Sequence, residues 1–144
     1  MKKLPKLILA FAFISLTYHK AAAQESLYKR LGGYDAISAV TEDFLTRLAT
    51  DKSLSRFFIG LSDDSKLKVK NHIVELVCMA TAGPCSYTGR DMKTSHKGLG
   101  ISEADWNIMA GHFVATLNKF KVPQKEQDEL LAIVATTKKD IVEK

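Results

Sequence analysis

The sequence predicts an all-α fold, and three features of its patterning support this prediction. Apolar residues recur at helical spacing in four long stretches between residues 35 and 142. Residues that favour helix starts, namely Asp35, Ser102 and Pro123, stand at the beginning of three of these stretches. No stretch shows a convincing alternation of apolar and polar residues, which would indicate a half-buried strand. Amphipathic helices that each bury one face favour a helix-on-helix architecture.

The first long helix is expected after Gly32-Gly33, where a short helix at residues 27–31 turns sharply. Asp35 is its predicted N-cap, because a carboxylate oxygen accepts a hydrogen bond from the N–H groups of the first turn. A short apolar piece at residues 54–58 and a loop at residues 60–64 follow this helix. Its apolar positions fall at helical spacing: Ile37, Val40, Phe44 and Leu48.

The second long helix is predicted over residues 65–82, and Gly83-Pro84 ends it. His72 belongs to its apolar stripe and is therefore expected on the buried or pocket-facing side. Residues 86–100 are rich in Gly, Lys and Ser, which favours an extended loop with at most one or two helical turns around His96. The stripe of the helix comprises Val69, His72, Ile73, Leu76, Val77 and Ala80.

Two further long helices complete the pattern. Ser102 is the predicted cap of the third, and the acidic residues Glu103 and Asp105 suit the positive end of its dipole. Pro123 suits the first turn of the fourth helix. The buried faces are expected to include Trp106, Met109, Phe113 and Leu117 on the third helix, and Gln127, Leu130, Val134 and Ile141 on the fourth.

Residues 1–23 have the layout of a secretory signal. Three early lysines precede an apolar run of about ten residues, and Ala21-Ala22-Ala23 fits a cleavage site. The run is shorter than the roughly 20 apolar residues of a membrane-spanning helix, although an uncleaved anchor is the alternative. Residues 24–144 are then one domain, expected in the periplasm without stable membrane association.

The charge balance argues against nucleic acid as a partner. Residues 1–23 hold four Lys and no acidic residue, so residues 24–144 carry 17 basic and 16 acidic side chains, a net charge of +1. The sequence pI of about 9.2 therefore belongs partly to the signal segment. A nearly neutral domain has no electrostatic reason to bind a polyphosphate backbone.

Two cysteines, Cys78 and Cys85, flank Gly83-Pro84, where the chain can reverse and bring them together. Export would place them in an oxidising compartment, so a disulfide and a pair of free thiols are both compatible with the sequence. A Cys-x-x-Cys-His motif for covalent c-type haem is absent from the sequence.

Three histidines follow residue 23, and His96 is the best placed to bind haem iron. Neutral imidazole is the usual axial ligand in oxygen carriers. Gly98 and Gly100 give the nearby backbone room to approach a flat cofactor. A solvated surface histidine is the alternative for His96. His112 lies on the third helix, where it is expected to pack in the core and to bind iron only should His96 fail.

Seven short segments, in this order, resemble the group I truncated haemoglobins. The likeness runs from about residue 26 to residue 142, and it implies a two-over-two helical globin around one non-covalent b-type haem and its iron. The resemblance assigns the proximal iron ligand to His96 and haem packing to Phe58. The segments are Leu27-Tyr-x-x-Leu-Gly-Gly33, Phe57-Phe58, Gly83-Pro84, Tyr87-Thr-Gly-Arg90, Met92-Lys-x-x-His96, Gly98-Leu-Gly-Ile101 and Ala110-Gly-His112.

The resemblance also places the distal side of the haem on the second long helix. Some similar proteins, notably cyanobacterial ones, carry a histidine at the position of His72 that coordinates the iron directly, so His72 is a hypothetical sixth ligand. The alternative is a histidine at the haem edge that contacts a propionate or solvent. The distal positions implied by the likeness are Val69, His72, Ile73, Leu76 and Val77.

Two positions depart from the family pattern. Leu45 stands where many members have a tyrosine that donates a hydrogen bond to bound oxygen, and Ile73 stands where a glutamine is common. A hydrogen bond that involves a charged group contributes about 1.5–3 kcal/mol, so losing one shortens oxygen residence by about tenfold or more. We therefore expect neither very tight oxygen retention nor a tuned nitric oxide dioxygenase.

The same likeness suggests further contacts with the cofactor. Met92 is expected to touch the haem face, with ordinary core packing as the alternative. Three residues are candidates to meet the anionic propionates, or else are solvated: Tyr87, Arg90 and Lys93. Trp106 and Phe44 are core residues that could also line the haem.

The predicted function is reversible binding of a diatomic gas, namely oxygen, nitric oxide or carbon monoxide. Electron exchange with an unidentified electron donor and haem-dependent detoxification of nitric oxide or peroxide are the alternatives, so enzymatic activity is left open. A third hypothesis omits haem and describes a helical interaction module closed by Cys78–Cys85.

Overall fold

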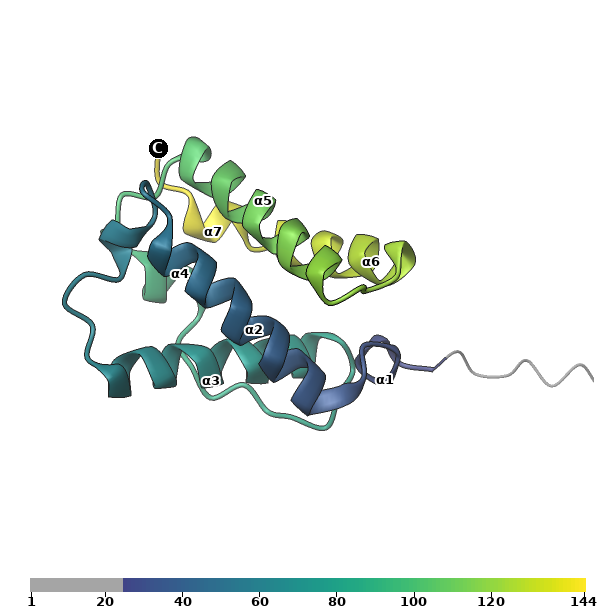
Figure 1. The fold of residues 1–144 in the computed structure, drawn as a ribbon. Coiled ribbons are helices and arrows are strands. Elements are labelled where there is room, and N and C mark those ends of the chain that lie inside the picture. Colours follow the sequence, from purple (N-terminus) through teal and green to yellow (C-terminus); the bar gives the residue numbers. More distant parts are fainter. Residues whose placement is uncertain (1–24) are drawn as a thin grey trace, which may run out of the picture.

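The computed structural model describes residues 25–144, which are mainly helical, with no strand in that range (Figure 1). The predicted signal segment, residues 1–23, lies outside the described residues. The all-α prediction is confirmed. Between residues 25 and 144, no helix is both long and apolar enough to cross a membrane. The helices are α1 (Leu27–Arg30), α2 (Gly33–Thr50), the 3-10 helix η1 (Ser55–Phe57), α3 (Asp63–Ala80), α4 (Met92–His96), α5 (Glu103–Lys119), α6 (Gln124–Ala135) and α7 (Lys138–Ile141).

Two pairs of long helices make the two layers of the fold. Figure 1 shows α2 crossing α3 in the lower part of the view, with α5 and α6 running above them. Helix α2 contacts both α3 and α5, and so joins the two layers. The short helix α4 lies at the end where α7 and the C-terminus also gather (Figure 1).

The two earlier long helices begin two residues before their predicted starts. Asp35 is not the N-cap of α2, since the helix begins at Gly33 and Gly32 takes the cap position with φ of 92°. Only glycine adopts this left-handed conformation at low cost, so the Gly32-Gly33 pair sets the sharp turn out of α1. Helix α3 begins at Asp63, because the Ser62 hydroxyl accepts a hydrogen bond from the Ser65 N–H.

Ser102 caps α5 as predicted, within a reciprocal capping box. The Ser102 hydroxyl accepts from the Asp105 N–H at 3.2 Å, and Asp105 Oδ2 accepts from the Ser102 N–H at 2.9 Å. Asp105 Oδ1 also accepts from Arg56 Nη2 at 2.6 Å, which fixes η1 against the start of α5. These hydrogen bonds, the largest contribution coming from Ser102, lower the pKa of Asp105 to about 2.

The predicted fourth helix is two helices. Pro123 is the N-cap of α6, which ends at Ala135, and α7 begins at Lys138 after Thr136 and Thr137. The hydroxyls of these two threonines donate to the carbonyls of Ile133 and Val134, which competes with continuation of the helix. Ile141 therefore belongs to α7 rather than to the α6 face.

The densest part of the core lies where α1, α5 and α6 meet. It is formed by Leu27, Phe113, Leu117 and Leu130, all buried. The Phe44 ring packs edge-on against Phe113 with centroids 5.2 Å apart, and so carries the core across to α2. At the other side of the α2–α5 contact, Asp43 accepts hydrogen bonds from Arg47, Thr116 and Lys119.

Replacing Asp105 by asparagine should lower the free energy of unfolding by on the order of 1 kcal/mol at pH 7, because it weakens the cap and removes the charge that faces Arg56. The folded pKa is about 2 and the unfolded carboxyl titrates near its ordinary value of 3.8. The stabilisation is therefore present above about pH 4 and is lost as the pH falls toward 2.

Urea titrations followed by circular dichroism at several pH values measure this difference. Glu103→Gln, in the same first turn but exposed, is the matched control and should change the free energy of unfolding by less than about 0.5 kcal/mol. Equal free energies of unfolding for wild type and Asp105→Asn at pH 7 would contradict the stabilising role of the Asp105 carboxylate.

Candidate functional site

A large cavity of about 900 Å³ lies between the two layers. Residues of α2, α3, α4, α5 and α6 form its walls, and most of the wall is apolar. The volume and lining are typical of a site for a large, mainly apolar ligand with a few polar anchor points. The apolar part of the wall includes Ile37, Val40, Leu48, Leu54, Phe57, Leu61, Met109, Phe113, Ile133 and Val134.

The structure brings nearly all the predicted site residues to this cavity. Lys93 is the exception, because it is exposed and does not line the wall. On α4 the lining positions are Met92, Ser95 and His96, at helical i, i+3, i+4 spacing, and Lys93 falls outside that stripe. The predicted residues on the wall are Phe44, Leu45, Phe58, Val69, His72, Ile73, Leu76, Val77, Tyr87, Arg90, Met92, His96 and Trp106.

His96 is held in one orientation at the wall. Its Nδ1 lies 2.8 Å from the carbonyl oxygen of Met92, one turn earlier in α4. A carbonyl only accepts hydrogen bonds, so Nδ1 carries the proton and the lone pair of the neutral ring is on Nε2. This arrangement is the usual one for a histidine that binds a metal through Nε2.

Both ends of the His96 segment are anchored. Asp91 caps α4 by accepting from the N–H and hydroxyl of Thr94 at 2.8 and 2.7 Å, and these bonds hold the pKa of Asp91 below its ordinary value. After the helix, the Glu143 carboxylate accepts from the N–H groups of Gly98 and Gly100 at 2.7 and 2.6 Å. The chain around His96 is therefore tied to the C-terminal segment.

His72 also lines the cavity, but its ring is less constrained. Its Nδ1 is buried and makes no hydrogen bond among the described residues. The nearest carboxylate oxygen is Glu75 Oε2, at 3.5 Å, beyond a normal hydrogen bond. The Tyr87 ring stands nearly perpendicular to the imidazole with centroids 6.0 Å apart.

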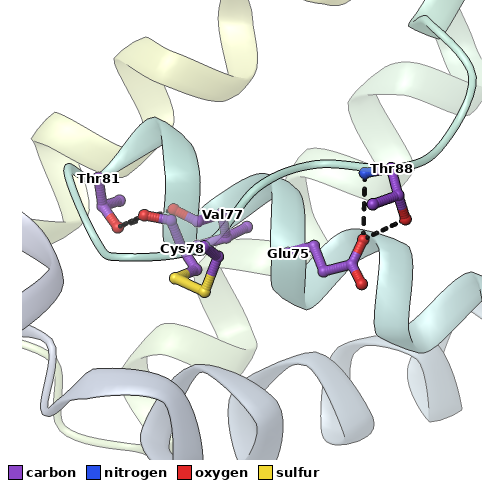
Figure 2. The surroundings of a disulfide bond; sticks show 6 residues. Glu75, Val77, Cys78, Thr81 and Thr88 are labelled. Atoms are coloured by element: carbon purple, nitrogen blue, oxygen red, sulfur yellow. Dashed lines mark hydrogen bonds between the residues drawn. A yellow bond between two sulfur atoms is a disulfide. The ribbon is translucent and has the colours of Figure 1, made fainter.

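A loop that follows α3 closes one side of the cavity, and two links hold it to that helix (Figure 2). Cys78 and Cys85 form a disulfide, so the thiol alternative is wrong, and Cys78 is fully buried. Farther along the loop, Glu75 Oε2 accepts from the N–H and hydroxyl of Thr88 at 3.3 and 3.0 Å. These bonds hold the pKa of Glu75 below its ordinary value, and the bond from the Thr88 hydroxyl has the larger effect.

Few hydrogen-bond donors face the cavity from α2 and α3. Leu45 and Ile73, the two departures from the family pattern, both line it. The Thr41 hydroxyl donates to the Ile37 carbonyl within α2, and the Tyr87 hydroxyl donates to the Arg90 carbonyl at 2.6 Å. The polar side chains that α3 contributes to the wall are Ser65, Lys68 and His72, and His72 is the imidazole among them.

Sequence reasoning missed several polar residues of the wall: Thr41, Ser65, Lys68, Thr88, Ser95 and Asp105. Lys68 could have been found, because it lies four residues before His72 and so falls near the same face of α3. Thr88 and Ser95 depend on how the loop and α4 fold, which no periodicity indicates. His112 is bonded instead to Asp51, with Nε2 and Oδ2 2.9 Å apart, and is not part of the wall.

Comparison with known proteins decides the family. The bacterial-like globin family profile matches residues 26–143. The chain belongs to the bacterial-like globin family. Over 120 residues this globin is 37% identical to a group 1 truncated haemoglobin of Mycolicibacterium paratuberculosis, covering 83% of this chain and 86% of that protein.

Solved structures agree with this assignment. The 2/2 haemoglobin of Synechococcus matches with a TM-score of 0.74 at 27% identity, covering 82% of this globin and 98% of that chain, and its haem is covalently attached. A truncated haemoglobin of Tetrahymena pyriformis matches in fold with a TM-score of 0.76 at 24% identity, covering 83% of this globin and all of that chain. The predicted group I, two-over-two fold is confirmed.

Haem is the cofactor that this family implies, and the cavity fits it. The wall is mainly apolar, as the porphyrin faces require, and His96 presents a lone pair at Nε2. Arg90 and Lys68 supply cationic groups on the wall for the anionic propionates. The buried, unpaired Nδ1 of His72 marks a second imidazole whose hydrogen bonding the protein alone leaves incomplete.

The double variant Cys78→Ser/Cys85→Ser should unfold more easily, because the disulfide restricts the unfolded chain. Closure of a loop of this length, with a sequence separation of 7, contributes about 2–3 kcal/mol in the chain-entropy treatment. Urea titration of the haem-loaded protein with and without dithiothreitol gives the comparison. The double variant serves as the control for the reductant, because it has no disulfide to reduce and its urea midpoint should not change. An unchanged wild-type midpoint in dithiothreitol would contradict the prediction.

Proposed function

We propose that this globin binds a b-type haem non-covalently in the cavity and reversibly binds a diatomic gas. The observation that carries the proposal is the oriented imidazole of His96, whose Nε2 lone pair stands at the wall of a large apolar cavity. Haem held there would supply an iron atom to which oxygen, nitric oxide or carbon monoxide can bond.

His96 is the proposed proximal ligand. Donation from its Nδ1–H to the Met92 carbonyl makes Nε2 a stronger ligand and prevents the ring from rotating. The cap at Asp91 and the Glu143 bonds keep the short helix α4 in place although five residues alone make a marginal helix. Phe58, Met92 and Trp106 supply apolar surface for the porphyrin and exclude water from it.

His72 is the proposed sixth ligand when no gas is bound, or a gate that swings aside when gas enters. Because Leu45 and Ile73 offer no hydrogen bond, His72 is also the group that can donate one to a bound gas. This distal side favours reversible binding over tight oxygen retention. The same reasoning gives no support to a tuned nitric oxide dioxygenase.

Non-covalent attachment of the haem is supported by the state of the two cysteines and by the sequence around them. Both cysteines are in the disulfide, and a Cys-x-x-Cys-His motif is absent from the sequence. The Synechococcus 2/2 haemoglobin, by contrast, holds its haem covalently. The propionates are proposed to meet Arg90, Lys68 and the polar Tyr87 edge, with the exposed Lys93 a more distant contributor.

We also propose that the mature protein is residues 24–144, exported to the periplasm. The signal-like composition of residues 1–23 and the disulfide support this proposal, because disulfides persist in oxidising compartments. Oxygen binding needs ferrous iron, so an electron donor that reduces the ferric form is part of the proposal.

Replacing His96 by alanine should abolish stable haem uptake, because it removes the proximal bond. The absorption spectrum of the purified protein, ferric and then ferrous with carbon monoxide, measures this as loss of the Soret band. His112→Ala is the matched control and should keep its haem, since His112 lies outside the cavity wall. Wild-type Soret absorption in His96→Ala would overturn the proximal assignment.

Replacing His72 by alanine should convert the ferric protein from a low-spin, six-coordinate form to a high-spin form with water or no sixth ligand. Carbon monoxide should also bind the ferrous variant faster, because the competing imidazole is gone. Absorption spectra and flash photolysis are the measurements. A wild-type ferric spectrum that is already high-spin and water-bound would count against His72 ligation.

A further inference from the structure

Two donors of Thr88 and one ring nitrogen of His72 lie around one oxygen of Glu75. Thr88 N–H and Thr88 Oγ1 donate to Oε2 at 3.3 and 3.0 Å, and His72 Nδ1 lies 3.5 Å from the same atom. The other oxygen, Oε1, accepts no hydrogen bond among residues 25–144. An ionised carboxylate has about four acceptor positions over its two oxygens, so its capacity here is only partly used.

His72 Nδ1 lies near this carboxylate and itself lacks a hydrogen-bond partner within residues 25–144. It is a buried side-chain nitrogen without a partner among the described residues, and leaving such a group unpaired is unfavourable. Rotation of the Glu75 carboxylate about χ3 is soft, because torsions of this type have broad minima. A rotation that brings Oε1 toward Nδ1 would give His72 an acceptor of its own while Oε2 stays with Thr88.

We propose that Glu75 is a positioning residue for His72: its carboxylate accepts the Nδ1–H bond and so directs the Nε2 lone pair into the cavity. This inference rests on the proposed role of His72 at the iron. A neutral imidazole carries one ring proton, and whichever nitrogen holds it cannot ligate a metal. A carboxylate beside Nδ1 therefore selects the tautomer that is able to bind iron.

Thr88 gives this arrangement its connection to the rest of the cavity wall. Its two bonds fix the carboxylate from the loop side, and the same loop carries Tyr87, whose ring stands against the His72 imidazole. The loop is in turn fixed at its start by the Cys78–Cys85 disulfide (Figure 2). His72, Glu75 and Thr88 thus form one chain of contacts from the cavity to the loop.

The decisive variant is Glu75→Gln, which keeps the size of the side chain. Its carbonyl oxygen can still accept from Thr88, but the amide then presents N–H donors to Nδ1. His72 must respond by accepting at Nδ1 and carrying its proton on Nε2, which removes the lone pair needed at the iron. The equilibrium constant for the six-coordinate ferric form should fall about tenfold or more, as is typical when the partner of a metal-bound histidine is lost.

The matched control is Glu42→Gln. Glu42 also pairs with α3, through Lys70, but does not line the cavity. This variant should leave the low-spin fraction unchanged at fixed pH. A Glu75→Gln spectrum equal to that of the control would overturn the inference, provided His72→Ala has shown that His72 is the sixth ligand.

A second measurement does not depend on ligation at the iron. In the diamagnetic ferrous carbon monoxide form, ¹⁵N chemical shifts report which ring nitrogen of His72 carries the proton. We expect the proton on Nδ1 in the wild type and in Glu42→Gln, and on Nε2 in Glu75→Gln.

The two measurements separate the inference from the proposed function. If His72→Ala leaves the ferric spectrum unchanged, the sixth-ligand proposal fails, and Glu75 is judged by the tautomer alone. The same His72 tautomer in wild type and Glu75→Gln would overturn the positioning role, whatever the iron spectrum shows.

Discussion

The hydrogen bond from His96 Nδ1–H to the Met92 carbonyl is the interaction on which the site depends. It fixes both the ring orientation and the tautomer, and it lies within a helix of only five residues. So short a helix needs outside support, which the Asp91 cap supplies before it and the Glu143 carboxylate supplies after it. The proximal side is therefore held by two parts of the chain, the segment of residues 91–100 and the C-terminal Glu143.

A cavity of this size also requires that the helices around it be held by contacts elsewhere. The buried cluster of Leu27, Phe113, Leu117 and Leu130 packs α1, α5 and α6 together, and three of its four residues also form part of the cavity wall. Asp43 joins α2 to α5, and Asp105 joins η1 to the start of α5 through Arg56. Because these polar links are directional, they set the spacing between helices that apolar packing alone would not specify.

The distal side has a different character from the proximal side. Its apolar residues, Leu45 and Ile73 among them, offer no hydrogen bond to a ligand, so the proposed behaviour of this side depends on His72. The His72 imidazole is also held less firmly than that of His96, because its Nδ1 lacks, among the described residues, the hydrogen bond that His96 Nδ1 makes.

The sequence by itself determined the helical class, the placement of His72 on the inner stripe of α3 and the Ser102 cap, since these depend on local spacing and capping chemistry. It also supplied enough ordered motifs to indicate the globin family, confirmed over residues 26–143. Tertiary structure alone decided that Glu75 reaches Thr88 and that Glu143 reaches Gly98. Those contacts join residues 13 and 45 positions apart, and no local periodicity encodes which distant backbone groups a flexible carboxylate will meet.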